Sequence, residues 1–166
     1  MESEWFLVAD SPLIGRDAAC ALITLEGGRY LVQLRDDIPE IFYPGHWGLF
    51  GGAIEPGETP EQALRRELAE ETSIRPGAID YFTSFVIDLT AFGQQKITRL
   101  VYEVPVTDAQ VDALVLGEGS AFDVATADEI LTGRRLVPYD SFALWMHHAR
   151  GRLERGAAPA TVAIGR

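Results

Sequence analysis

The stretch from Gly51 to Ile74, which reads GGAIEPGETPEQALRRELAEETSI, constrains the fold more than any other part of the chain. A glycine pair and an acidic turn lead into a helical pattern. Thr59 can cap the free amides of a helix, and Pro60 suits the first helical position because no backbone donor is lost there. Gln62 falls where its side chain can reach back and complete a capping box. The spacing therefore predicts a helix that begins at Pro60.

One side of this helix is acidic. At about 100° per residue, Glu67, Glu70 and Glu71 fall within an arc of roughly 100°. Leu64 and Leu68 lie beside one edge of that arc, so the acidic side borders the core. Carboxylates this close repel one another, and a hard divalent cation such as Mg²⁺ or Mn²⁺ would relieve the repulsion. The alternative is an acidic face that is only solvated, which is the commoner origin of such a run.

The residues before the helix favour the metal site, because together with the helix they resemble the signature of the Nudix hydrolase family. The matching positions are Gly52, Glu58, Arg66, Glu67, Leu68, Glu70, Glu71 and Ile74. One position departs from the signature: where the family has glycine before the final aliphatic residue, this chain has Ser73. Glycine there suits a helix end with a positive φ. The departure removes no carboxylate, so the argument for a metal is unaffected.

The resemblance implies roles for a set of oxygen donors. Glu70 and Glu71 would be metal ligands, and Glu67 would be a ligand or the general base. The main-chain carbonyl of Gly52 would also face the metal. In a later, glycine-flanked loop, Glu118 resembles a family glutamate that joins the metal site or acts as the base. A turn carboxylate without such a role is the equal alternative for Glu118.

The family also uses the positions of Arg66 and Glu58, and their role has two interpretations. The resemblance implies that they orient the loop against the helix, which places Arg66 with the catalytic residues. An arginine and a carboxylate placed to pair can equally serve geometry alone.

Aromatic residues gather just before the glycine pair, in the segment FYPGHWGLF. Phe42, Tyr43, Trp47 and Phe50 could form a stacking wall for a nucleobase, although aromatic residues beside a core more often serve packing. Within and just before this region, Arg35, Trp47 and Phe50 are the candidate substrate-binding residues.

The rest of the chain alternates β-like and helical patterns. The resemblance implies an α/β fold, a Nudix-like α/β/α sandwich with a mixed central sheet. Runs rich in β-branched and aromatic residues predict strands at Trp5–Ala9, Ala18–Leu25, Arg29–Arg35, Ile79–Leu89 and Lys96–Val106. A short helix is expected from Asp108 to Leu114, and the resemblance to the family implies another around Asp128–Ile130.

A last helix is predicted from Pro138 to Glu154, covering the face of the sheet opposite the signature helix. Its apolar stripe is expected to consist of Phe142, Trp145, Ala149 and Leu153. His147 and His148 are adjacent and point in different directions, so they lack the spacing of a helical metal pair and are expected on the surface.

Length and charge bound the class of protein. With 166 residues, the chain is expected to form one domain (residues 1–166), with residues 155–166 as a mobile tail or an edge strand. The formal net charge of -11 argues against a nucleic-acid partner, whose phosphates need clustered Lys and Arg. No run approaches the roughly 18 apolar residues of a membrane helix, and the N-terminus lacks a secretory pattern. We expect a cytoplasmic protein with no membrane partner, and a homodimer would be in keeping with the family.

The resemblance implies a metal-dependent pyrophosphohydrolase that cleaves a nucleoside diphosphate linked to another group. We favour a nucleoside triphosphate as substrate, an oxidised purine nucleotide being one candidate. Nucleotide sugars, ADP-ribose and dinucleoside polyphosphates are alternatives. A non-catalytic nucleotide sensor is disfavoured because the signature glutamates are all present. An isomerase acting on a diphosphate ester would need Cys20, the only cysteine and otherwise expected to be a buried structural thiol, to face the carboxylates.

Overall fold

Strand β1 (Ala18–Leu25) lies at the centre of the sheet because both of its faces are apolar. In the computed structural model, which describes residues 13–154, its side chains alternate between two cores. Ala19, Ala21 and Ile23 belong to one core, whereas Cys20 and Leu22 belong to the other. A strand covered on both sides is typical of a sheet packed between two helical layers.

The sheet is mixed and has seven strands, with the order β3-β2-β1-β6-β5, β4 paired to β1 and β7 paired to β2. The pair β1–β6 is parallel, and the other pairs are antiparallel. The remaining strands are β2 (Arg29–Leu34), β3 (Trp47–Gly48), β4 (Phe50–Ala53), β5 (Asp80–Asp88), β6 (Lys96–Pro105) and β7 (Ala121–Thr126).

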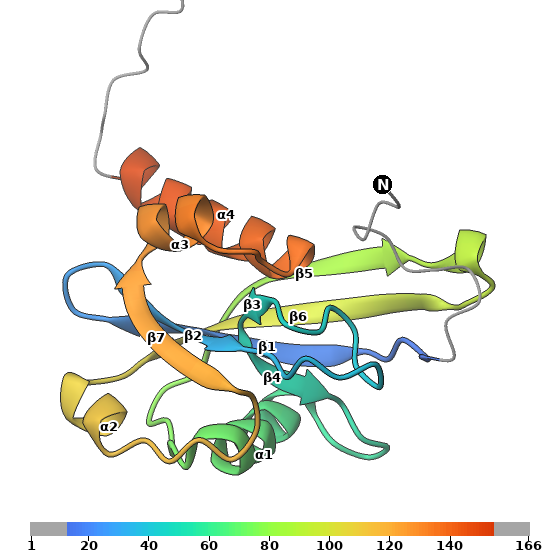
Figure 1. Cartoon of the computed structure of the whole chain (residues 1–166), viewed down its shortest axis with the longest axis horizontal. Coiled ribbons are helices and arrows are strands. Elements are labelled where there is room, and N and C mark those ends of the chain that lie inside the picture. Colours follow the sequence, from blue (N-terminus) through green and yellow to red (C-terminus); the bar gives the residue numbers. More distant parts are fainter. Residues whose placement is uncertain (1–12, 155–166) are drawn as a thin grey trace, which may run out of the picture.

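Helices cover both faces of the sheet (Figure 1). Helix α1 (Pro60–Thr72) and the short α2 (Asp108–Asp112) lie on one side, and α3 (Ala127–Gly133) and α4 (Pro138–Glu154) lie on the other. A 3₁₀ turn, η1 (Thr90–Phe92), lies in the connection from β5 to β6. The expected α/β/α sandwich is confirmed. Within residues 13–154, no helix is both long enough and apolar enough to cross a membrane.

Most predicted elements have the expected bounds, and those of β1 and α4 agree to the residue. Thr107 caps α2 as expected, with Gln110 completing the capping box. The predicted strand Trp5–Ala9 and the predicted tail 155–166 lie outside the described residues.

The expected packing face of α4 is wrong. Phe142 and Trp145 are 50% and 54% exposed, whereas Ala143 and Leu144 are buried against the sheet. The two aromatic rings stack on each other at the rim, with Phe142 also against Phe85 of β5.

The expectation that His147 lies on the surface is also wrong. Its side chain is only 10% exposed, and the ring lies against the rings of Tyr30 and Phe82. Its Nδ1 is 2.8 Å from the Tyr30 hydroxyl, and its Nε2 is 3.2 Å from Glu103. Beside its partners on β2, β5 and β6, His147 is part of the packing of α4 on the sheet.

Candidate active site

Both ends of α1 are fixed by residues of the signature. Thr59 caps the helix, and Pro60 is its first residue. The Thr59 hydroxyl accepts a hydrogen bond from the Gln62 amide at 3.2 Å, and the Gln62 side chain accepts one from the Thr59 amide at 2.8 Å. At the other end Ser73 has φ 58° in the left-handed region. Ser73 thus adopts the conformation for which glycine is preferred, and its hydroxyl accepts a hydrogen bond from the Val115 amide.

The glycine pair before the helix permits two very close approaches. Gly51 has φ 122°, and a Cβ there would lie 2.2 Å from the carbonyl oxygen of Ala19 on β1. A Cβ on Gly52 would lie 2.5 Å from the carboxyl carbon of Glu67. The first glycine lets β4 pair with β1, and the second brings the Gly52 backbone against a carboxylate of α1.

Arg66 connects the loop to the helix. Its guanidinium binds Glu58 through two hydrogen bonds, at 2.8 and 3.0 Å, and donates another to the Ala53 carbonyl at 3.0 Å. It also binds Glu67 at 2.7 Å and Glu70 at 3.3 Å. The hydrogen bonds from Arg66, followed by one from the Glu55 amide, lower the pKa of Glu58 to about 2. This geometry suits a residue that positions the loop and its neighbouring carboxylates.

Glu71 is the most buried carboxylate of the helix, with 6% of the residue exposed. Its carboxylate accepts hydrogen bonds from the Gly51 amide at 2.7 Å and from the Gln33 amide group at 3.3 Å. Burial, together with the negative charges of Glu67 and Glu118, raises the pKa of Glu71 to about 7, against the effect of these hydrogen bonds.

The later loop brings Glu118 to the same place. The Gly117 amide donates a hydrogen bond of 2.7 Å to the carbonyl of Glu71, which holds the loop against the end of α1. Glu118 itself is exposed, and its charge contributes to the raised pKa of Glu67, although burial is the main cause there. The fold therefore gathers Gly52, Glu67 and Glu118 with the two remaining signature glutamates around one end of the signature helix.

The donor set suits a hard divalent cation, although the side chains are not arranged around one. Across residues 13–154, no three acidic, histidine or cysteine side chains lie so that they could hold a metal ion. Arg66 accounts for part of this, because it binds Glu67 and Glu70. Carboxylate and carbonyl oxygens are the ligands that Mg²⁺ prefers. Glu71 is in addition a buried carboxylate whose hydrogen-bond partners are neutral, a costly state that a cation would relieve.

The comparison with protein families agrees with this site. The model of the NUDIX domain matches residues 15–152. The chain belongs to the Nudix family.

Relatives and solved structures are consistent with this assignment. The nucleoside triphosphatase NudI of Escherichia coli is 46% identical over 56 residues, which are 34% of this chain and only 38% of NudI. A MutT protein of Methanosarcina mazei has a TM-score of 0.68 at 23% identity, covering 85% of this chain and 97% of that one. The E. coli ORF135 protein has a TM-score of 0.66 at 25% identity, covering 88% and 96%. The structural matches agree with the Nudix fold, whereas the match to the curated relative spans about a third of either chain.

Two of the three candidate substrate-binding residues of this Nudix chain, Phe50 and Trp47, are packed against other parts of the protein. Phe50 is fully buried in the core beneath α1, so its ring offers no face to a base and is excluded from the substrate site. One face of the Trp47 ring is covered by the Arg134 guanidinium, whose carbon lies 4.1 Å from the ring centroid. Phe50 and Trp47, two of the aromatic residues before the glycine pair, thus serve mainly in packing.

Arg35, in contrast, lies at an open groove of about 450 Å³, with Arg16 and Phe42 also lining it. Its Nε donates a hydrogen bond of 3.0 Å to the Phe42 carbonyl. Arg35 therefore stays a candidate for substrate binding.

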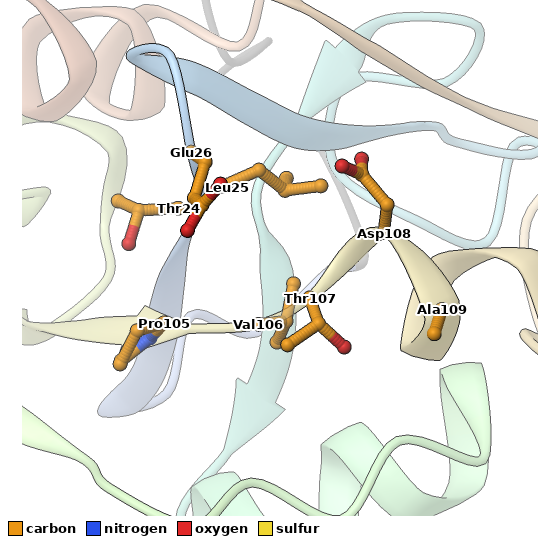
Figure 2. Close-up of a pocket in the computed structure, with 8 residues that line it drawn as sticks. All are labelled: Thr24, Leu25, Glu26, Pro105, Val106, Thr107, Asp108 and Ala109. Carbon is orange, nitrogen blue, oxygen red and sulfur yellow. The ribbon is translucent and has the colours of Figure 1, made fainter.

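A second hollow, of about 560 Å³, lies at the opposite end of β1 and is shown in Figure 2. Its lining includes the carboxylates of Glu26 and Asp108. Asp108 pairs with Arg29 at 3.0 Å. Acidic side chains would repel an anionic nucleotide, and the register of β1 with β4 places the signature glycines toward the other end of the strand. This hollow is not a candidate substrate site.

Sequence reasoning missed three polar residues with little exposed surface, of which Gln33 and Asp140 are buried. Gln33 on β2 binds Glu71 and the Leu49 carbonyl. Asp140 on α4 is buried and accepts a hydrogen bond of 3.0 Å from the Leu49 amide. Arg99 on β6 lies 3.8 Å from Asp140. The available signal was a polar residue inside an apolar strand, in YLVQL for Gln33 and KITRLVYEV for Arg99.

Cys20 does not face the carboxylates. It lies in the core on the α4 side of the sheet, and α1 packs on the other side. Burial raises the pKa of its thiol to about 11, so the thiol is protonated at neutral pH. The expected buried structural thiol is confirmed, and this location gives the isomerase alternative no support.

Proposed function

We propose that this Nudix protein hydrolyses a nucleoside triphosphate to a nucleoside monophosphate and pyrophosphate in a reaction that depends on Mg²⁺, with Mn²⁺ as a substitute. The observation that carries the proposal is the gathering of carboxylates at α1: Glu67 lies against the Gly52 backbone, Glu71 binds the Gly51 amide, and the charges of Glu67 and Glu118 both act on Glu71. Glu70 lies on the same helix and shares Arg66 with Glu67. The similarity to the nucleoside triphosphatase NudI, over part of its length, supports this choice of substrate.

In this proposal the cation would be held by the Gly52 carbonyl and by carboxylates of Glu67, Glu70, Glu71 and Glu118. When bound, Mg²⁺ neutralises the charge that develops on phosphate oxygens as water attacks phosphorus. The Gly51 amide and Gln33 already hold the Glu71 carboxylate in one orientation. Substrate binding therefore does not carry the entropy cost of ordering this side chain.

The remaining groups move the proton and hold the loop. Glu67 and Glu118 are the candidates for accepting the proton of the attacking water, since the charges of both act on Glu71 and Glu67 also lies against the Gly52 backbone. Arg66 positions Glu67 through their hydrogen bond and fixes the loop through Glu58. Arg66 is therefore proposed as a positioning residue.

Product analysis tests the reaction and the substrate class. The purified protein would be incubated with Mg²⁺ and a panel of nucleoside triphosphates, nucleotide sugars, ADP-ribose and dinucleoside polyphosphates, with pyrophosphate and phosphate measured separately. We expect pyrophosphate and a monophosphate from a nucleoside triphosphate, at a kcat/KM at least tenfold above the other classes. Equal trace activity on every class would remove the preference, and release of single phosphates would contradict the cleavage position.

A further inference from the structure

Gln33 is a buried polar side chain that contacts three separate parts of the candidate active site. It lies on β2, and only 3% of the residue is exposed. Its Nε2 donates a hydrogen bond of 3.1 Å to the Leu49 carbonyl, just before β4, and another of 3.3 Å to a carboxylate oxygen of Glu71 on α1. Its Oε1 lies beside Gly119, where a Cβ would be only 2.9 Å away. One amide group thus touches the signature helix, the segment before the glycine pair and the loop that contains Glu118.

The partners of this amide fix its orientation. A main-chain carbonyl and an ionised carboxylate only accept hydrogen bonds, so the nitrogen of the amide must face them. Its oxygen is then left on the side of Gly119. Turning the amide over would place its oxygen against two other oxygens. The Gln33 side chain therefore has one favourable orientation, and that orientation involves Glu71 and the loop together.

The loop is pressed against the rest of the site on both sides of Glu118. Before Glu118, a Cβ on Gly117 would collide with the carbonyl oxygen of Glu70 at the end of α1. After Glu118, Gly119 has φ 85°, and a Cβ there would lie 3.0 Å from the carbonyl oxygen of Leu34 on β2. Glycine at both positions lets the loop lie close to both elements. The place of Glu118 therefore depends on the contacts between α1 and β2.

We propose that Gln33 is a positioning residue that places Glu71 and Glu118 relative to each other for the binding of one divalent cation. The proposal rests on the proposed function, in which both glutamates hold the cation. The hydrogen bond from Nε2 holds the Glu71 carboxylate, and Oε1 limits how closely Gly119 and its loop approach. Side chains that hold a metal ligand in this way typically contribute about tenfold to 100-fold to metal affinity.

Binding of Mn²⁺, followed by the electron paramagnetic resonance signal of the free ion, tests this role without any turnover. Gln33→Met keeps the length of the side chain and removes both of its polar atoms. We expect the dissociation constant for Mn²⁺ to rise by about tenfold to 100-fold. An unchanged dissociation constant in Gln33→Met would overturn the proposal.

Gln94→Met is the matched control for the loss of an amide. The Gln94 side chain also binds two backbone groups, the Leu13 carbonyl at 2.6 Å and the Gly15 amide at 2.9 Å. It lies in the connection between β5 and β6 rather than at α1. Gln94→Met should therefore bind Mn²⁺ as the wild type does. Equal weakening in Gln94→Met and Gln33→Met would make the effect a general loss of stability and overturn the proposal.

Gln33→Met also leaves the buried Leu49 carbonyl without this donor, which can lower stability by itself. Double variants separate that loss from positioning. If Gln33 acts through Glu71, Gln33→Met should weaken Mn²⁺ binding by less than about twofold when Glu71→Gln is already present. The same should hold when Glu118→Gln is present. A merely structural loss would lower the affinity by the same factor in every background, so a full effect in either background would overturn the proposal.

Gly119→Ala tests the loop contact with Gln33 left in place. The added Cβ would lie 2.9 Å from the Gln33 Oε1, so the amide or the loop must shift. Gly93→Ala is the matched control, because Gly93 also has a positive φ, 74°, and a Cβ there would meet nothing within 4 Å. Both variants carry the cost of a left-handed alanine, whereas only Gly119→Ala should weaken Mn²⁺ binding, by about tenfold or more. Equal Mn²⁺ affinity in the two variants would overturn the coupling to the loop.

Mn²⁺ binding and turnover can fail separately, which distinguishes this proposal from the proposed function. The expected pattern in Mn²⁺ binding, found without turnover of any nucleotide, would support the role of Gln33 and contradict the enzyme. Pyrophosphate release by the wild type, with Mn²⁺ binding unaffected by Gln33→Met, would do the reverse. Absence of Mn²⁺ binding by the wild type would overturn the role of Gln33 whatever the turnover.

Discussion

Replacing Gly52 by alanine should damage the active site and leave the fold intact. The added Cβ would lie 2.5 Å from the carboxyl carbon of Glu67. Carbon atoms normally stay about 3.5–4.0 Å apart, so this carboxylate must move by about 1 Å or more. A displacement of about 1 Å at a catalytic group costs roughly 100-fold in rate. The atoms in the way belong to the end of a flexible side chain, so the backbone can stay where it is.

The free energy of unfolding should change by no more than about 1 kcal/mol in Gly52→Ala. Alanine gains about 0.4–1 kcal/mol by restricting the unfolded chain, and a strained Glu67 rotamer costs about 0.5–1.5 kcal/mol. Gly51→Ala is the matched comparison, because its Cβ would lie 2.2 Å from the Ala19 carbonyl oxygen at φ 122°. The clash is with a backbone atom, and the φ value is one that alanine rarely adopts. We therefore expect Gly51→Ala to lower the free energy of unfolding by at least about 3 kcal/mol.

Urea denaturation and steady-state kinetics on the same preparations measure the two effects. We expect Gly52→Ala to unfold at nearly the wild-type midpoint with about 100-fold lower kcat/KM, and Gly51→Ala to be strongly destabilised. Wild-type activity in Gly52→Ala would refute the contact between the Gly52 backbone and Glu67 as a feature of the working site. Equal destabilisation of the two variants would refute the distinction between side-chain and backbone obstacles.

Two further predictions concern stability. Ser73→Gly should be more stable than Ser73→Ala by about 1 kcal/mol in urea denaturation, because both lose the hydroxyl and only alanine keeps the cost of a left-handed residue; equal stability would contradict the strain. The pKa of Cys20 is raised to about 11 in the folded protein, so its stabilising effect is complete below pH 9 and is lost as pH rises toward 11. Between pH 8 and pH 10.5 the wild-type protein should lose about 2 kcal/mol more than Cys20→Ala, from 1.36 kcal/mol per pKa unit, and parallel curves would contradict a buried thiol.

The signature helix could be predicted from the sequence because its determinants are local. Thr59 and Gln62 cap α1, and the acidic face follows from helix geometry alone, so no distant contact is needed. Even Ser73, the departure from the signature, takes the conformation that its place at the helix end demands. The bounds of β1 could also be predicted, since a short apolar run between turn residues is typical of a buried strand.

The parts that could not be predicted depend on contacts between segments distant in sequence. Phe42, Arg99 and Tyr139 lie at one cavity only because β1 pairs with β6 and α4 crosses above them. The prediction of the packing face of α4 was wrong because periodicity locates an apolar stripe but cannot tell a buried stripe from one at the rim, and the buried residues are Ala143 and Leu144. Phe50 was predicted to bind substrate for a similar reason. The sequence alone does not distinguish an aromatic residue that packs in the core from one that contacts a ligand.

The most direct test of the account is the dependence of turnover on the acidic face of α1. Pyrophosphate release from the preferred nucleoside triphosphate would be measured against Mg²⁺ concentration for the wild type, Glu70→Gln, Glu71→Gln and Glu61→Gln. Glu61 is the matched control, because it is exposed in the first turn of the same helix. The account predicts that removing Mg²⁺ abolishes activity, that Glu70→Gln and Glu71→Gln lower kcat/KM by about 100-fold or more, and that Glu61→Gln matches the wild type. Full activity without a divalent cation, or in both Glu70→Gln and Glu71→Gln, would contradict it.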